Sequence, residues 1–229
     1  MSASPAPSFG LTASQRRWAA LVAAGLLAVV LVIGVRVAHT AGPLHVDRLG
    51  ARVVDTPQIP HARRVFRGLV WLGSPEFVAG AVAALGAWRL ARRDVLGAAT
   101  AVVAPLLAIA LTEVVAKPLI GRHLSSIGNA FAFPSGHVTG AAALAAVLVA
   151  LAVRAWGRRA AWLALPVVLL PLGVSAGVVR AGFHYATDAV GGIAMGFSAV
   201  LSVVAVCAAY EDRRAARRAG LSVGAADSP

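Results

Sequence analysis

Long apolar runs separated by short arginine clusters constrain this chain more than any other feature of its sequence. They fall at about residues 18–35, 74–88, 95–116, 138–153, 161–179 and 189–209. A helix that crosses a bilayer needs roughly 20 mostly apolar residues. Only 13% of the 229 residues are charged, against about a quarter in soluble domains. We therefore predict an all-α fold, a polytopic membrane helical bundle with six transmembrane helices.

The same pattern divides the chain into three parts. Residues 1–15 are rich in Ser, Ala and Pro and are predicted to be disordered. Residues 16–210 hold the six-span domain, and residues 211–229 form a basic cytoplasmic tail. The polar stretch at residues 39–67, between the first two runs, is predicted to be an external loop.

The arginine clusters predict the orientation of the bundle. The segments predicted to lie inside hold 12 of the 21 basic residues, and every short inside loop is strongly basic. The positive-inside rule then places both termini in the cytoplasm of a multi-pass protein of the cell membrane. The net charge of +12 is accounted for by these topology signals, so no binding of nucleic acid is predicted. The one cysteine, Cys207, lies in an apolar run and suggests no thiol chemistry.

Ionisable and small polar residues gather at one predicted face of the membrane. The candidate site residues are Lys117, Arg122, Ser135, Gly136, His137, Arg180, His184 and Asp188. With six spans, all of them fall on the outer face, although nothing in their selection required this. Ionisable groups in such positions are costly to hold, so they are functional candidates by default.

Two histidines and a carboxylate offer the chemistry of phosphate-ester cleavage. That reaction needs a nucleophile that attacks phosphorus and an acid that protonates the leaving oxygen. His184 and Asp188 are four residues apart, so on a helical turn they share a face. A carboxylate on one imidazole nitrogen fixes the tautomer and leaves the other nitrogen for attack. Our hypothesis makes His184 the nucleophile, Asp188 its orienting partner and His137 the acid.

Four further residues are suited to hold the phosphoryl oxygens. Ser135 and Gly136 stand at the start of an apolar run, where a hydroxyl and free backbone N–H groups can bind an anion. Lys117 and Arg122 add positive charge, which stabilises the charge that develops in the transition state.

Each of these residues also has a simpler interpretation. Lys117 and Arg122 are typical of interfacial anchors, and Glu113, four residues before Lys117, is placed to pair with it. Asp188 could only favour a helix N-terminus, and Arg180 could only snorkel to the interface. Two histidines and one aspartate without a second acidic cluster make a weak metal site, so neither a metal nor a cofactor is predicted.

Together these residues resemble the signatures of the type 2 phosphatidic acid phosphatase (PAP2) superfamily, whose fold is shared with vanadium haloperoxidases. The signatures are Lys-x6-Arg-Pro, Pro-Ser-Gly-His and Ser-Arg-x5-His-x3-Asp. Residues 134–137 match the second unaltered, Lys117 begins the first, and His184 and Asp188 end the third. The resemblance covers about residues 70–210. It implies a PAP2/haloperoxidase-like core, a phosphohistidine intermediate on His184, acid catalysis by the other histidine and no metal cofactor.

The chain departs from those signatures at both arginines. The Arg-Pro of the first signature falls on residues 124–125, which are Leu and Ser, and the Ser-Arg of the third falls on residues 177–178, which are Gly and Val. Arg122 and Arg180 each lie two residues from an expected position. We predict that these two side chains bind the substrate phosphate instead.

The sequence therefore predicts an integral membrane phosphatase that acts on a lipid phosphate or diphosphate at the outer face. A polyprenyl diphosphate such as undecaprenyl diphosphate is the first candidate, followed by phosphatidic acid and phosphatidylglycerol phosphate. The alternatives are a non-catalytic lipid-phosphate binder or transporter, and a lipid phosphotransferase on the same fold. The predicted partners are the lipid substrate and the membrane, and the sequence makes no prediction of oligomeric state.

Overall fold

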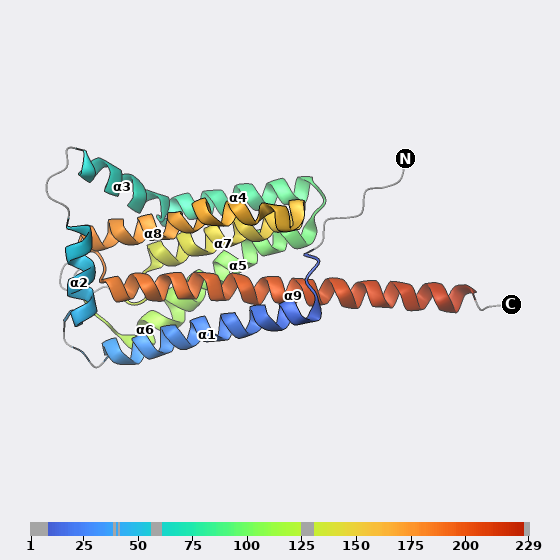
Figure 1. The fold of residues 1–229 in the computed structure, drawn as a ribbon, viewed down its shortest axis with the longest axis horizontal. Helices are drawn as coiled ribbons and strands as arrows, with labels where there is room; N and C mark the ends of the chain where they lie inside the picture. The colour runs from blue at the N-terminus through green and yellow to red at the C-terminus, as the bar shows by residue number, and fades with distance from the viewer. Residues whose placement is uncertain (1–8, 39, 41, 56–60, 125–130, 227–229) are drawn as a thin grey trace.

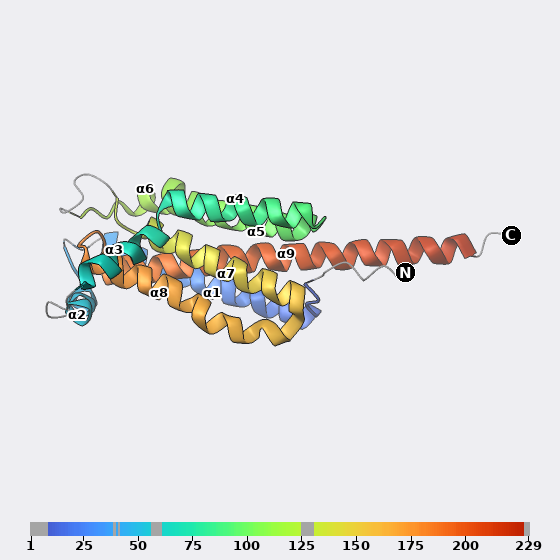
Figure 2. The ribbon, with the colours of Figure 1, turned by 90° about the horizontal axis from the view of Figure 1, so that it is seen from above.

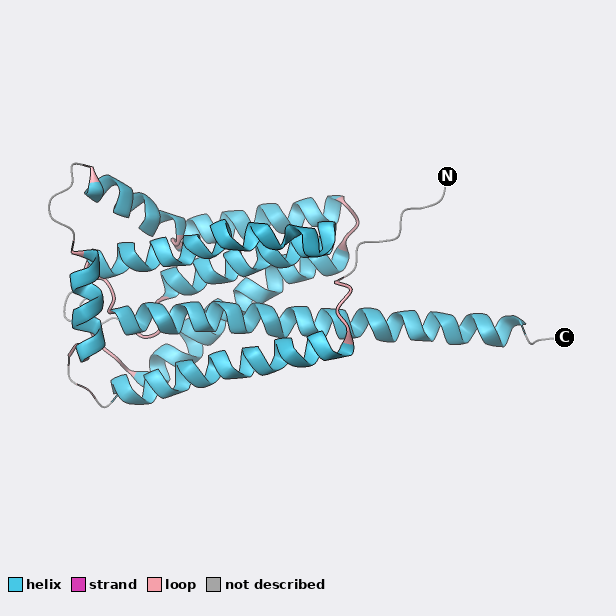
Figure 3. Ribbon diagram, in the orientation of Figure 1, coloured by secondary structure: helices cyan, strands magenta, loops and turns pink. Residues whose placement is uncertain are grey.

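Long helices that run side by side form an elongated bundle (Figure 1). The computed structural model describes residues 9–38, 40, 42–55, 61–124 and 131–226. Across these ranges the regular structure is helical, apart from an isolated bridge between His123 and Phe131. Figure 3 shows the same distribution of helices and loops. The predicted all-α fold class is confirmed.

The helices described by the structure occupy the predicted apolar runs and three segments between them, which are α2, α3 and α6. In chain order they are α1 (Ala13–Ala38), α2 (His45–Val54), α3 (Ala62–Leu72), α4 (Pro75–Ala91), α5 (Val95–Ala110), α6 (Lys117–Ile120), α7 (Gly136–Trp156), α8 (Ala164–Arg180) and α9 (Ala186–Ala226). A π-helical turn, η1 (Leu111–Ala116), joins α5 to α6, and a 3₁₀ segment, η3 (Gly157–Leu163), precedes α8.

Several helices are long and apolar enough to cross a membrane. Within the described residues there are four such segments, Ala13–Ala38, Val95–Ile120, Gly136–Trp156 and Ala186–Arg218. A fifth span results if α3 and α4, which meet at a bend of 50°, cross together. The apolar part of α8, Val167–Arg180, is shorter than these. The membrane bundle is confirmed, and the count of six spans stays a prediction.

Helix α7 is the central element of the bundle. It packs against α4, α5, α8 and α9, and a run of buried alanines and glycine from Gly140 to Ala146 lets these neighbours approach closely. The approach is close at α9, where a Cβ at Gly196 would lie 2.7 Å from the Thr139 carbonyl oxygen of α7. In contrast, α1 packs on α9 from the outside, and its outward apolar side chains, such as Leu31, are exposed to the surrounding lipid.

Two segments that were predicted to lack structure are partly helical. The predicted loop at residues 39–67 contains α2 and half of α3. The predicted disordered tail at residues 1–15 lies outside the described residues up to position 8, but Phe9 is buried in the core and α1 begins at Ala13. Where the structure describes them, both segments differ from the expected loop and tail for the same reason, and the division of the chain into these parts stays a prediction. A short helix or segment that packs on the end of a bundle needs few apolar residues, so its composition resembles that of a loop.

The two ends of the bundle differ in what covers them. At one end α2 lies across the bundle, while at the other end α9 extends beyond it without a break (Figures 1 and 2). This second end holds a buried ionic cluster in which Asp94 accepts from Arg154 Nη2 at 2.9 Å and pairs with Arg89 at 3.3 Å. Arg154 also pairs with Glu211. Arg89 and Arg154 therefore form ion pairs between helices, in addition to their predicted role in orienting the protein in the membrane.

Candidate active site

The segments that carry the candidate residues meet at the end of the bundle that α2 covers. These segments are α6 and the chain that follows it, the start of α7, the end of α8 and the start of α9 (Figures 1 and 2). The candidate residues are therefore on one side of the molecule, as the predicted parity of the spans required. The structure brings only some of them together in one pocket.

His184 lies two residues before α9 and Asp188 lies in its first turn, so the two side chains are close although His184 is outside the helix. Asp188 is fully buried and His184 is 8% exposed. His184 Nδ1 lies 3.6 Å from Asp188 Oδ2, which is an ion-pair distance rather than a hydrogen bond. Among the described residues this nitrogen has no hydrogen-bond partner, while the same carboxylate oxygen accepts the Tyr185 N–H at 2.9 Å. The carboxylate thus faces Nδ1 and leaves Nε2 as the nitrogen for attack.

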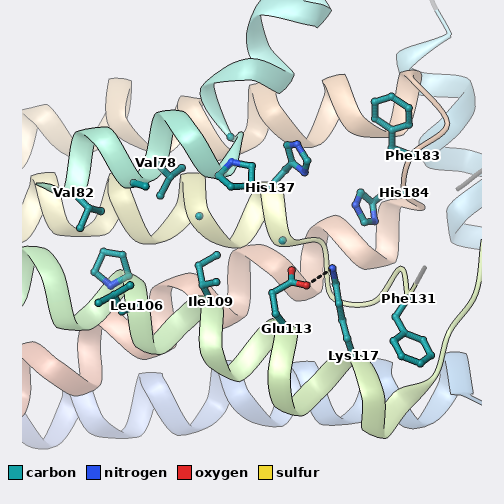
Figure 4. A pocket seen from close by; sticks show the side chains of 16 residues that line it. Val78, Val82, Leu106, Ile109, Glu113, Lys117, Phe131, His137, Phe183 and His184 are labelled. Atoms are coloured by element: carbon teal, nitrogen blue, oxygen red, sulfur yellow. Dashed lines mark hydrogen bonds and ion pairs between the residues drawn. The ribbon is translucent and has the colours of Figure 1, made fainter. Parts of the chain in front are cut away.

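Both histidines line the same pocket of about 690 Å³. Figure 4 shows His137 and His184 toward one end of it, with Lys117 and Glu113 on the opposite wall. The other end is apolar and is formed by side chains of α4 and α5. They are Val78, Ala79, Val82, Pro105, Leu106 and Ile109. The pocket therefore combines a small polar end with a long hydrocarbon wall.

The start of α7 lies at the polar end of this pocket. Gly136 and His137 form its first turn, whose N–H groups have no partner within the helix. The Ser135 hydroxyl is fully buried and lacks a hydrogen-bond partner within the described part of the chain. A Cβ at position 136 would lie 2.3 Å from the Glu113 Oε1 atom, so a larger residue there would require the Glu113 side chain to move. This turn is suited to bind an anion, as predicted from its sequence.

Lys117 lines the pocket but already has an anionic partner. Its Nζ donates to Glu113 Oε2 at 2.8 Å, which is the pairing that the four-residue spacing indicated (Figure 4). The π-helical turn η1 contains Glu113 and ends at the residue before Lys117. Such turns insert one residue into a helix and are frequent at functional sites. Glu113 is thus a pocket residue that the sequence presented only as a possible partner for Lys117.

Arg122 lies in a closed ionic network behind the pocket, and its side chain is only 3% exposed. Its Nη1 donates to Asp188 Oδ1 and to Thr187 Oγ1, and its Nη2 donates to Asp47 Oδ2 at 2.8 Å. The guanidinium also stacks on the Tyr185 ring, with its carbon 4.3 Å from the ring centroid. In this structure Arg122 therefore binds carboxylates. Its predicted contact with the substrate phosphate stays a prediction.

Arg180 points away from the two histidines. It donates to the Val54 carbonyl oxygen at 2.7 Å, lies 3.9 Å from Asp55 and stacks on the Phe66 ring. It lines a separate cleft together with Arg63 and other residues of α3. A substrate phosphate between the histidines would therefore need a different Arg180 rotamer, and its predicted role in binding phosphate stays a prediction.

Three functional neighbours had no signal in the sequence. Asp47, Thr187 and Tyr185 surround Arg122, but α2 was predicted to be a loop, and a buried ion pair between residues 75 positions apart leaves no local pattern. In the described ranges, no group of three or more His, Cys, Asp or Glu side chains is arranged to hold a metal ion.

Comparisons with known proteins show similarity to one family and to one solved fold. The family model of the PAP2 superfamily matches residues 112–212, which include all eight candidate residues. The fold is similar to the crystal structure of a transmembrane PAP2-type phosphatidylglycerolphosphate phosphatase from Bacillus subtilis, with a TM-score of 0.67 over 83% of this chain and 96% of that chain. The two sequences are 20% identical, so the similarity is one of fold. No curated protein matches this chain.

Proposed function

We propose that the chain, which matches the family model of the PAP2 superfamily over residues 112–212 and has the fold of a membrane phosphatase, hydrolyses a lipid phosphate or diphosphate through a phosphohistidine. One observation carries the lipid class of the substrate. His137 and His184 lie at the polar end of a pocket whose remaining wall is hydrocarbon. A soluble phosphate ester has no hydrocarbon chain to pack against that wall. A lipid can place its chains there and its phosphate between the histidines.

The proposed reaction has two steps. His184 Nε2 attacks phosphorus while the bond from phosphorus to the lipid oxygen breaks, and His137 gives a proton to that oxygen. Water then attacks the phosphohistidine, His137 takes the proton, and inorganic phosphate leaves. The Ser135 hydroxyl, the first N–H groups of α7 and Lys117 hold the phosphoryl oxygens. No step in this scheme requires a metal ion.

The first test is phosphate release by the purified protein in detergent. Undecaprenyl diphosphate, phosphatidic acid and phosphatidylglycerol phosphate are offered separately, with and without EDTA. We expect release from at least one of these lipids, unchanged by EDTA and inhibited by vanadate. Loss of release on chelation would contradict the metal-independent mechanism. The preferred lipid would identify the substrate, with undecaprenyl diphosphate as our first candidate.

A non-catalytic lipid-phosphate binder or transporter is the second candidate. It is favoured by the three candidate cations, each of which has a protein partner: Lys117 pairs with Glu113, Arg122 with two aspartates, and Arg180 with Asp55. Binding of a lipid phosphate without any release of phosphate would support this reading. A phosphotransferase would instead move phosphate to a second lipid, which chromatography of the products would detect.

The hydrocarbon wall gives a prediction about chain recognition. Ile109→Trp fills the apolar end of the pocket, and displacing about two methylenes at about 0.8 kcal/mol each raises KM roughly tenfold. We expect this rise for a long-chain lipid phosphate but not for a short, soluble phosphomonoester. Val103→Trp is the matched control, because Val103 lies on the same helix, is half exposed and does not line the pocket. Equal effects on both substrates would place the lipid chains elsewhere.

We propose an outer-face location for the site from the arginine clusters. The clusters at residues 16–17, 89–93, 154–159 and 213–218 fall at the end of the bundle opposite the histidines, where the positive-inside rule puts the cytoplasm. In this arrangement both termini are cytoplasmic, and the pocket opens at the depth of the headgroups of the outer leaflet.

A further inference from the structure

Asp47 is a buried carboxylate on α2 that belongs to none of the motifs discussed above. The whole residue is 2% exposed, and both of its oxygens are fully used. Oδ2 accepts from Arg122 Nη2 at 2.8 Å and from the Leu44 N–H at 2.9 Å. Oδ1 accepts from the Thr187 N–H at 2.9 Å and from the Thr187 hydroxyl at 2.7 Å. A carboxylate with four donors is built into the fold rather than left at its surface.

The donors around Asp47 keep it ionised. Burial by itself would raise the pKa of Asp47, but the bonds from Thr187, Arg122 and Leu44 outweigh burial and hold the pKa below its ordinary value. Arg122 therefore lies between two anions, Asp47 and Asp188. An arginine that is bonded on both sides cannot turn away from either carboxylate without leaving a buried charge unpaired.

The hydrogen bonds of Asp47 and Arg122 lead to Asp188, which faces the proposed nucleophile His184. One oxygen of Asp188 accepts from Arg122, and the other faces His184 Nδ1 at 3.6 Å. Thr187, which Asp47 holds through two bonds, is the residue directly before Asp188. Asp47 thus reaches the catalytic carboxylate by two routes, through the Arg122 side chain and through the backbone of α9.

The packing of α2 supports this connection. Gly50 lies one turn after Asp47, on the same face of α2. A Cβ at Gly50 would lie 2.5 Å from the Ala186 Cβ, so the helix sits directly on the start of α9. Figure 1 shows α2 across the ends of α8 and α9. The position of Asp47 is therefore set by backbone packing as well as by its ionic bonds.

We propose that Asp47 is a positioning residue of the active site. It holds Arg122 and Thr187 so that one oxygen of Asp188 is occupied and the other stays turned toward His184. This inference rests on the proposed phosphatase function, because orientation of the nucleophile matters only if His184 reacts. It assigns α2, an element outside the matched family segment at residues 112–212, a part in catalysis.

Asp47→Asn is the first test. In this variant an NH2 group replaces one carboxylate oxygen that accepts hydrogen bonds from Arg122 or Thr187. The negative charge that pairs with Arg122 is also lost. We expect kcat to fall about 10- to 100-fold, the loss typical of a misplaced catalytic group, with KM within about twofold. Asp47→Glu keeps the charge and should recover part of kcat. Thr187→Val, which removes one bond to Asp47, should lower kcat by a few-fold and covers the case in which Asp47→Asn fails to fold.

The matched control is Asp94→Asn at the opposite end of the bundle. Asp94 is also a buried carboxylate that accepts from two arginines and from a backbone N–H, but it lies in no proposed site. The Asp94→Asn variant should lower the melting temperature as Asp47→Asn does, and it should leave kcat of the folded protein unchanged. A merely structural role for Asp47 predicts the same behaviour in both variants, and that result would overturn the proposal. A rise in KM with unchanged kcat would overturn it as well.

A second readout does not depend on turnover. In protein labelled with 15N at histidine, the ring signals of His184 are assigned by their loss in His184→Ala. We expect a single tautomer with the proton on Nδ1 in the wild type, and a shift toward mixed tautomers in Asp47→Asn but not in Asp94→Asn. Unchanged His184 signals in Asp47→Asn would refute the positioning role. Absence of phosphate release by the wild type would instead refute the proposed function, while these spectra still decide on Asp47.

Discussion

Replacement of His184 by alanine is expected to lower phosphate release by on the order of 10⁴-fold or more, since removal of a catalytic nucleophile leaves only binding and oriented dipoles. The side chain is buried at the polar end of the pocket, and no other histidine of the described chain faces Asp188. The wild type should also form an acid-labile phosphoenzyme with 32P-labelled lipid, and His184→Ala should not. Rapid quenching followed by gel electrophoresis at neutral pH measures this species directly.

The control for this variant is His45→Ala. His45 is the first residue of α2 and is exposed, so its replacement should affect neither turnover nor the melting temperature. Substantial activity of a folded His184→Ala protein would exclude His184 as the nucleophile. A phosphoenzyme that persists in this variant would place the covalent intermediate on another residue.

The second large effect is expected for Arg122→Ala, in both stability and turnover. Its removal leaves Asp47 and Asp188 buried without their common cation, and breaking a buried pair in this way costs about 3–5 kcal/mol. The melting temperature in detergent should fall, and kcat of the folded fraction should fall because Asp188 loses the bond that orients it. Thermal unfolding and steady-state kinetics on the same preparation separate the two effects.

Arg154→Ala is the matched control for Arg122→Ala. Arg154 is equally buried and also bridges two carboxylates, Asp94 and Glu211, but at the other end of the bundle. It should lose a comparable amount of stability and keep the kcat of the wild type. If Arg122 served only to bind phosphate, its replacement would raise KM and weaken inhibition by vanadate, with little change in melting temperature.

Short-range features of this protein could be predicted from its sequence because their causes are local. The apolar runs predicted helices at the right places, since a bilayer selects for length and composition within one segment. The four-residue spacing placed Glu113 beside Lys117, because residues so spaced share a helix face, and the same spacing brings His184 close to Asp188 although His184 precedes α9. The parity of the six predicted spans placed both histidines at one face, whereas their meeting in one pocket depends on how the helices pack.

The partners of the arginines could not be predicted, because they depend on contacts between distant segments. By sequence, Arg122 and Arg180 each lay two residues from a signature position. In the fold, Arg122 is enclosed by Asp47 and Asp188, while Arg180 turns to Val54 and lines another cleft. The direction of a long side chain is decided by whichever charges the packed helices bring near it.

The membrane helices, the closeness of His184 to Asp188 and the turn that begins at Ser135 could all be inferred from the order of the residues. Each depends on apolar length or on spacing over a few residues. Only the tertiary structure decided that α2 packs on α9, that Asp47 joins the network of Arg122, and that α4 and α5 supply the hydrocarbon wall. The reason is physical: burial turns exposed polar groups into obligatory partners, and only the packed fold decides which groups are buried together.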